Sequence, residues 1–200
     1  MDTLYIVVPC YNETEVLRET TRCLVDKMNR MRSSGLISDD SRIMYVDDGS
    51  TDGTWQLIEQ LHRDNPTVEG VKLSRNMGHQ NALLAGLMTA KDKCDCAISM
   101  DADLQDDIEV LDDFIREYDA GCDIVYGVRS SRDKDTVFKR VTAEGFYKLL
   151  NKLGVETVYN HSEYRLMSTR ALEGLSKFEE VNLFLRGIVT RIGYRTGTVE

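Results

Sequence analysis

Residues 4–13 read LYIVVPCYNE, a short apolar run that ends at Pro9 in a group of polar side chains. An uninterrupted apolar run of this length is typical of a strand buried on both faces of a parallel sheet. The next apolar residues recur at helical spacing, at Leu17, Leu24, Met28 and Met31. Together these patterns predict a strand at 4–8 and an amphipathic helix at 13–32 that closes at Gly35.

The alternation of strand and helix continues as far as residue 127. Further strands are predicted at 43–46, 68–73, 97–100 and 123–126, with helices between them at 54–63, 80–90 and 108–118. Such alternation is typical of crossovers that place helices on both faces of a mostly parallel sheet, so the sequence predicts an α/β fold. Beyond this point we expect a charged loop at 129–136, helices at 141–153, 169–176 and 181–191, and strands at 164–167 and 194–199.

The composition excludes several classes of protein. With 42% hydrophobic and 30% charged residues, the 200-residue chain is expected to fold as one ordinary globular domain. A net charge of −9 argues against general electrostatic attraction to nucleic acid. Five cysteines, an odd count without a secretion signal, favour reduced thiols in the cytoplasm. No apolar run approaches the ~18 residues needed to span a bilayer, so we expect this chain to be soluble.

Polar residues follow four of the predicted strands. They form the segments PCYNE (9–13), DDGSTDGT (47–54), SRNMGHQ (74–80) and DADLQD (101–106). Ligands bind at the carboxyl ends of the strands in open parallel sheets, which makes these segments a candidate site. Two of these segments can also be explained by structure alone. Residues 47–54 suit a turn and a helix cap, and the carboxylates of residues 101–107 suit the N-terminus of a helix. Four polar ends on one edge favour a functional site.

Asp101 and Asp103 carry the strongest chemical signal. Residues two apart in an extended segment face the same way, so both carboxylates can reach one divalent cation. Carboxylates at the end of a buried strand are costly to leave unpaired, which also favours a cation there. Mg²⁺ or Mn²⁺ held by few protein ligands keeps positions open for diphosphate oxygens. We expect no cluster of His or Cys to offer a competing, softer site.

The chain resembles family 2 glycosyltransferases of the GT-A fold, in the branch that includes polyprenyl-phosphate glucosyltransferases and dolichol-phosphate mannose synthase. Six segments occur in the family's order: VVPCYNE (7–13), VDDGSTDGT (46–54), LSRNMGHQ (73–80), MDADLQD (100–106), VYGVR (125–129) and YRLM (164–167). The resemblance implies an inverting transferase that moves a hexose from a UDP- or GDP-linked sugar to an acceptor, most simply a polyprenyl phosphate, in cell-surface glycan synthesis. It places the enzyme at the cytoplasmic face of the membrane.

The resemblance also implies one catalytic domain over residues 1–200. Residues 1–127 would form the half that binds the nucleotide sugar, and 128–200 the half that faces the acceptor. Lipid-linked members of the family often continue into a membrane anchor, which would follow Glu200.

Individual roles follow from the same resemblance. The donor would contact Pro9, Tyr11, Glu13, Asp48, Arg75, Gly78, Asp101, Ala102, Asp103 and Gln105, with Tyr11 stacking on the base. Metal ligands would be Asp101, Asp103 and Gln105, and catalytic residues Asp103, Glu163 and Arg165. The acceptor phosphate would contact Arg129, Arg132, Lys139 and Arg140, although these residues also suit a solvated loop and helix face.

Glu163 departs from the family pattern. Relatives near this branch commonly carry Asp at this position, and one extra methylene moves a carboxylate by about an ångström, which puts its role in doubt. Arg165 would then order this carboxylate or contact a phosphate. His161 could join them, but it equally suits a structural role.

Several alternatives stay open. The acceptor is either a polyprenyl phosphate or a saccharide hydroxyl, since the same donor half serves both. A non-catalytic module that binds nucleotide sugar or metal would keep the same binding residues. A sugar nucleotidyltransferase would carry a Gly-rich basic loop after the first strand, and residues 9–13 differ from that pattern. The sequence leaves open the donor base, the sugar, and whether the chain is a monomer or a homo-oligomer.

Overall fold

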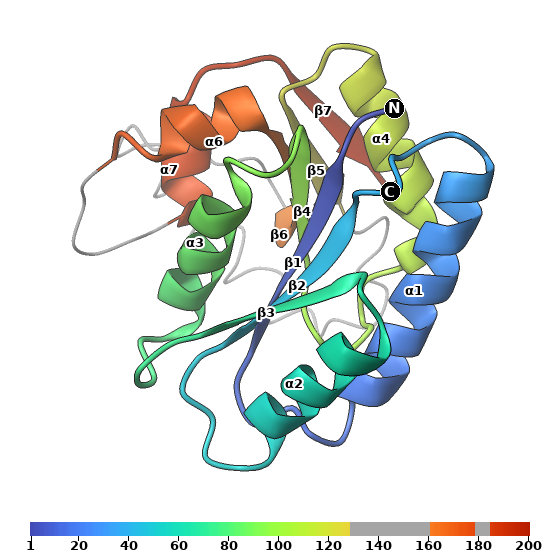
Figure 1. Ribbon diagram of the computed structural model, residues 1–200. Coiled ribbons are helices and arrows are strands. Elements are labelled where there is room, and N and C mark those ends of the chain that lie inside the picture. Colours follow the sequence, from blue (N-terminus) through green and yellow to red (C-terminus); the bar gives the residue numbers. More distant parts are fainter. Residues whose placement is uncertain (129–160, 179–184) are drawn as a thin grey trace, which may run out of the picture.

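The computed structural model describes residues 1–128, 161–178 and 185–200. These residues form a seven-stranded sheet with the order β3-β2-β1-β4-β6-β5-β7 (Figure 1). The strands are β1 (Leu4–Cys10), β2 (Arg42–Asp47), β3 (Val68–Lys72), β4 (Cys96–Ser99), β5 (Ile124–Val128), β6 (His161–Ser168) and β7 (Thr196–Val199). Neighbouring strands are parallel except where β6 pairs with β4 and β5. The predicted mostly parallel sheet is confirmed.

Helices cover both faces of the sheet (Figure 1). One face carries α1 (Leu17–Ser33), α2 (Thr54–Asp64) and α4 (Leu111–Asp119), and the other carries α3 (His79–Ala90), α6 (Thr169–Leu175) and α7 (Leu185–Arg191). Successive residues of β1 alternate between the two cores, with Ile6 in the first and Val7 in the second. Every residue of β1 is therefore buried, which is why its apolar run has no polar interruption.

Two predicted boundaries near the first strand were wrong. β1 continues to Cys10, because Pro9 lacks only the amide hydrogen and still pairs with Val46. α1 begins at Leu17 and not at residue 13, and the Glu13 amide donates to Thr54 Oγ1 at 2.9 Å, which ties the segment before α1 to the start of α2.

Other boundaries differ further along the chain. The helix predicted at 108–118 begins as a 3₁₀ turn, η1 (Ile108–Val110), because the Asp107 carboxylate accepts a hydrogen bond from the Glu109 amide at 2.9 Å. The strand predicted at 164–167 is longer, spanning His161–Ser168. The loop predicted at 129–136, the helix predicted at 141–153 and residues 181–184 of the last predicted helix lie outside the described residues.

β6 brings a distant part of the chain to the edge where β4 ends. It runs antiparallel to β4, and Arg165 pairs with Ser99, the last residue of that strand. The first residues of β6 therefore lie beside the segment that follows β4. This arrangement places Glu163 close to Asp101, one of the acidic pair formed by Asp101 and Asp103.

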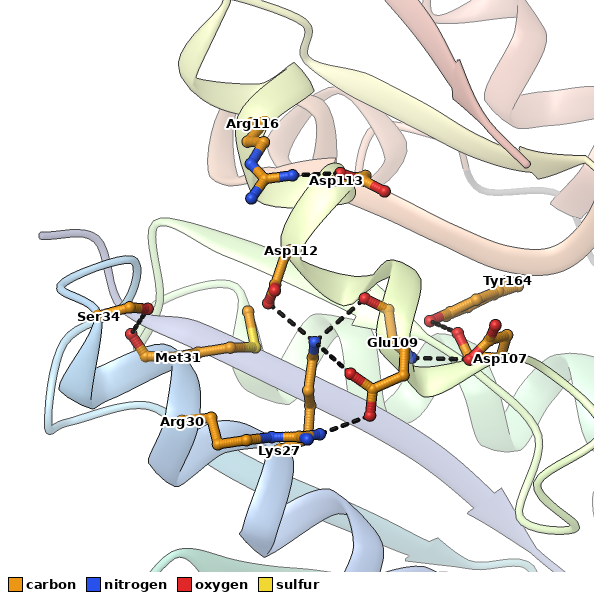
Figure 2. Close-up of polar contacts among 10 residues, drawn as sticks. All are labelled: Lys27, Arg30, Met31, Ser34, Asp107, Glu109, Asp112, Asp113, Arg116 and Tyr164. Atoms are coloured by element: carbon orange, nitrogen blue, oxygen red, sulfur yellow. Dashed lines mark hydrogen bonds and ion pairs between the residues drawn. The ribbon is translucent and has the colours of Figure 1, made fainter.

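The segment that follows the acidic pair is anchored from two sides (Figure 2). From α1, the buried Lys27 ammonium donates to the Glu109 carbonyl at 3.0 Å and pairs with the carboxylates of Glu109 at 3.1 Å and Asp112 at 3.0 Å. From β6, the Tyr164 hydroxyl donates to the Asp107 carbonyl at 3.0 Å. The segment at residues 107–112 is thus held between α1 and β6.

Within the described ranges, no helix has both the length and the apolar character required to cross a bilayer.

Candidate active site

An open cleft of about 260 Å³ lies at the carboxyl ends of β1, β2 and β4. All four polar segments contribute to its lining, which consists of Pro9, Cys10, Tyr11, Glu13, Asp48, Asn76, Gly78, His79, Ala82, Asp101, Ala102 and Asp103. Because the strands that precede these segments are neighbours in one sheet, their carboxyl ends bring the polar side chains together.

Two of the residues assigned to the donor lie elsewhere. Arg75 is exposed in the loop after β3 and does not line the cleft. Gln105 lines a separate shallow depression together with Leu104 and Asp106. The structure therefore brings Asp101 and Asp103 together in the cleft but does not bring the Gln105 side chain to them.

The loops after β1 and β2 are joined by hydrogen bonds. Asn12 adopts a left-handed conformation with φ of 57°, and its side-chain oxygen accepts from the Thr51 amide at 2.9 Å. The Asn12 amide donates to Ser50 Oγ at 2.9 Å. The turn expected in residues 47–54 is present, because Asp52 accepts from the Thr54 amide at 2.9 Å, but the N-cap residue of α2 is Gly53 and no side chain caps the helix. These bonds fix the wall of the cleft that carries Tyr11, whose side chain is exposed.

Asp48 has a role that the sequence did not reveal. Its buried carboxylate accepts hydrogen bonds from the backbone amides of Met77 at 2.7 Å and Gly78 at 2.9 Å. These bonds fix the loop between β3 and α3, in which Gly78 has a φ of 87°. Asp48 still lines the cleft, so the residue expected to contact the donor also orders the loop opposite it.

The acidic pair lies in a turn and not in the extended segment that we expected. β4 ends at Ser99, and Leu104 has a left-handed φ of 56°, so the chain turns back across the acidic pair. Asp101 and Asp103 are both exposed, and the argument that burial would require a cation therefore fails. The buried Thr20 hydroxyl fixes the turn from α1, where it donates to the Ala102 carbonyl at 2.6 Å.

Three carboxylates share the end of the cleft. Partial burial raises the pKa of Glu13, and the negative charges of Asp103 and Asp101 raise it further. Like charges at this range destabilise one another, and a bound cation relieves that repulsion. The electrostatics of Glu13, Asp101 and Asp103 therefore suit a divalent cation.

A second group links this acidic end to β6. His79 Nε2 forms a hydrogen bond with Glu163 Oε2, and Gln80 Nε2 donates to Glu163 Oε1. His79 Nε2 also lies 3.8 Å from Asp101 Oδ1. One ligand atom each from His79, Asp101 and Glu163 lie within 4.8 Å of one another. This group holds one histidine and two carboxylates, so it is not a cluster of His or Cys of the kind that a softer metal would favour.

A family comparison decides the class of the chain. The profile of Glycosyl transferase family 2 matches residues 5–176. The chain belongs to this family.

Relatives of this family 2 chain include a named transferase. The chain is 55% identical to the uncharacterized glycosyltransferase YkoT of Bacillus subtilis, over 98% of this chain and 58% of that protein. It is 37% identical to the bactoprenol glucosyl transferase of Shigella phage SfV, over 98% of this chain and 61% of that protein. The chain thus spans about three fifths of the length of these curated relatives.

Solved structures with this fold hold nucleotides and manganese. The mannosyltransferase PcManGT of Pyrobaculum calidifontis, in complex with GDP-Man and Mn²⁺, matches with a TM-score of 0.66 and 21% identity, covering 99% of this chain and 55% of that one. Glucosyl-3-phosphoglycerate synthase of Mycobacterium tuberculosis, in complex with Mn²⁺, UDP and phosphoglyceric acid, matches with a TM-score of 0.62 and 18% identity, covering 98% and 68%. The likeness confirms the GT-A fold of the family 2 chain.

The donor atoms in the cleft fit a hard divalent cation. The carboxylates of Asp101 and Asp103 offer oxygen ligands of the kind that Mg²⁺ and Mn²⁺ prefer. Both side chains are exposed, so such an ion would keep room for oxygens from a ligand. The His79 Nε2 atom lies 3.8 Å from Asp101 Oδ1, but this nitrogen contacts the Glu163 carboxylate.

Arg165 lies away from the cleft in this family 2 chain. Its side chain is buried, and its backbone pairs with Ser99 of β4 and Tyr126 of β5. It does not line the cleft, so the described geometry offers it no contact with a phosphate there. The predicted acceptor residues Arg129, Arg132, Lys139 and Arg140, and the side chain of His161, lie outside the described part.

Replacing Gly49 with alanine is expected to weaken both folding and donor binding. Gly49 has a φ of 68°, and an added Cβ would lie 2.5 Å from the backbone carbonyl carbon of Arg75 and 2.5 Å from the backbone nitrogen of Asn76. The loop that Asp48 holds would have to move, at a cost of about 1–3 kcal/mol in stability. Thermal unfolding should show a lower Tm and a smaller rise on adding Mn²⁺ and nucleotide. Gly35→Ala is the control, because it has a similar φ of 76° and its nearest neighbour is the flexible Met1 side chain at 3.9 Å.

Proposed function

We propose that this chain is the catalytic domain of a metal-dependent, inverting glycosyltransferase that moves a hexose from a nucleotide diphosphate sugar to a polyprenyl phosphate. The observation that carries the proposal is the cleft in which Glu13, Asp101 and Asp103 gather at one end, beside a loop fixed by Asp48. The complexes of related folds with Mn²⁺ and GDP-Man or UDP support the donor class. The relatives named bactoprenol glucosyl transferase support the acceptor class.

The setting of the reaction belongs to the same proposal. Residues 1–127 bind the nucleotide sugar, and residues 128–200 face the acceptor. Transfer takes place at the cytoplasmic face of a membrane, in the synthesis of a cell-surface glycan.

The residues of the cleft would share the work as follows. A divalent cation held by Asp101 and Asp103 would supply positive charge where negative charge develops on the departing diphosphate. Tyr11 presents an exposed ring at the mouth of the cleft, which suits stacking on the base. Carboxylate oxygens of Glu163 and Asp101 lie within 4.8 Å of each other, and Glu163 would orient the acceptor oxygen for attack opposite the leaving group.

Transfer to a saccharide hydroxyl is the second candidate, and the placement of Glu163 favours it. A hydroxyl acceptor needs a general base, and Glu163 is a carboxylate held in place beside the acidic pair. A phosphate monoester has a second pKa near ~6 and is mostly ionised at neutral pH, so it needs little help from a base.

Thermal shift measurements with UDP- and GDP-linked sugars test the proposed function. We expect one class of nucleotide sugar to raise the Tm by several degrees in the presence of Mn²⁺ and by much less in EDTA. Transfer of the labelled sugar to a short polyprenyl phosphate should then follow. Binding without hydrolysis or transfer would indicate a non-catalytic module, and the absence of any shift would contradict the proposal.

A further inference from the structure

Two consecutive side chains at the start of α3 hold both oxygens of the Glu163 carboxylate. His79 contacts Oε2 and Gln80 contacts Oε1, across 84 and 83 positions of sequence. The Gln80 Nε2 can only donate, and His79 Nε2 donates where the Glu163 carboxylate is ionised. The Glu163 side chain is 10% exposed, and with both oxygens engaged it has little freedom to choose another orientation.

The side-chain oxygen of Gln80 also forms a hydrogen bond. Its Oε1 accepts from the backbone amide of Leu185, the first residue of α7, at 3.2 Å. This bond fixes which end of the amide faces Glu163, since the oxygen must face the Leu185 N–H. The orientation of Glu163 is therefore tied to the position of α7.

The start of α3 is itself fixed from the donor side. Gly78, which immediately precedes His79, donates its amide hydrogen to the Asp48 carboxylate at 2.9 Å. A Cβ at Gly78 would meet nothing within 4 Å, so its φ of 87° serves the path of the backbone and not a close packing contact. The loop between β3 and α3, which borders the cleft, thus fixes the position of His79 and Gln80 at the start of α3.

We propose that His79 and Gln80 are positioning residues that hold the Glu163 carboxylate in one orientation toward the acceptor. The inference rests on the proposed function, because Glu163 acts on an acceptor only if the chain transfers sugar. His79 Nε2 also lies 3.8 Å from Asp101 Oδ1 at the donor end, and Gln80 also accepts a hydrogen bond from the first residue of α7. His79 and Gln80 therefore connect the β3–α3 loop, which borders the cleft, with Glu163.

Kinetics separate positioning from a purely structural role. We expect Gln80→Leu and His79→Leu each to lower kcat by roughly three- to tenfold, and by no more than Glu163→Gln. For Gln80→Leu the KM for the donor should stay within about twofold of wild type, because Gln80 does not line the cleft. Adding Gln80→Leu to Glu163→Gln should lower kcat no further, because Gln80 acts through Glu163. His79→Gln keeps an N–H donor and should recover much of the lost kcat. Gln56→Leu, the same substitution on the exposed side of α2, is the matched control.

A second measurement requires no turnover. In a double-mutant cycle of Gln80→Leu and Glu163→Met, the changes in the unfolding equilibrium constant should depart from additivity by about fivefold or more. Additive changes would overturn the inference, as would an unchanged kcat in both leucine variants of an active enzyme. A rise in the Mn²⁺ requirement of His79→Leu with full kcat at saturation would assign His79 to the metal and also overturn it. A wild-type chain that transfers sugar to no acceptor would contradict the proposed function, while the unfolding cycle would still decide whether the pair holds Glu163.

Discussion

Replacing Asp103 with alanine is expected to reduce metal-dependent sugar transfer by about 10²- to 10³-fold or more. Asp103 lines the cleft, and its charge acts on Glu13, so it belongs to the group of carboxylates that suits a cation. Its loss would leave Asp101 as the main oxygen ligand and would weaken the stabilisation of charge on the leaving diphosphate. Initial rates of transfer over a series of Mn²⁺ concentrations measure the effect.

The Asp103 substitution should leave the fold nearly intact. The side chain is exposed, and its one hydrogen bond in the described structure is accepted from the Gln105 amide at 3.1 Å. We therefore expect a Tm within about 2 °C of wild type in the absence of ligand. Asp113→Ala, which removes an exposed carboxylate of α4 that pairs with Arg116, is the matched control and should keep full activity. Full transfer by Asp103→Ala in EDTA would remove the metal from the mechanism.

The sequence predicted the parallel part of the sheet because its signals are local. A strand buried on both faces must be apolar at every position, as β1 is, and a polar segment must follow where the strand reaches the ligand edge. Both signals are visible within a dozen residues. The meeting of the four polar segments in one cleft then follows from the topology of a parallel sheet.

The place of β6 could not be predicted in this way. No local pattern states that this strand lies between β4 and β5 and runs antiparallel to both. The contact of Glu163 with His79 depends on that topology, so the role of His79 was missed although its motif had been noted. The only signal was a polar pair directly after Gly78, at the start of a helix.

The role of Asp48 illustrates a different limit. A carboxylate at a strand end can face a ligand or accept hydrogen bonds from backbone amides, and the residue type suits both. Asp48 accepts from two amides of the β3–α3 loop, which the sequence cannot foresee because the loop lies about 30 residues away. Side-chain partners across loops depend on the folded backbone and not on local composition.

Replacing Glu163 with glutamine is expected to distinguish the two acceptor classes. Glutamine keeps the length of the side chain and one oxygen acceptor, but it cannot take up a proton. If the acceptor is a polyprenyl phosphate, the attacking oxygen is already ionised at neutral pH, and transfer should fall by no more than about tenfold. If the acceptor is a hydroxyl, loss of the general base should lower transfer by about 10²- to 10⁴-fold. Transfer rates of wild type and Glu163→Gln, measured with a polyprenyl phosphate and with saccharide acceptors, give the loss for each acceptor class.

The loss of transfer with a polyprenyl phosphate can be compared directly with the loss with a hydroxyl acceptor, because both reactions use the same donor site. Glu163 does not line the donor cleft, so the substitution should leave nucleotide binding and its Mn²⁺ requirement unchanged. Glu173→Gln, on the exposed side of α6, controls for the change in net charge. A mild loss with the phosphate and a severe loss with a hydroxyl would mean that the chain can use both and that ionisation of the acceptor decides the need for a base. A severe loss with the phosphate as well would mean that Glu163 contributes by its negative charge and not as a proton acceptor, since a phosphate oxygen has no proton to give up at neutral pH.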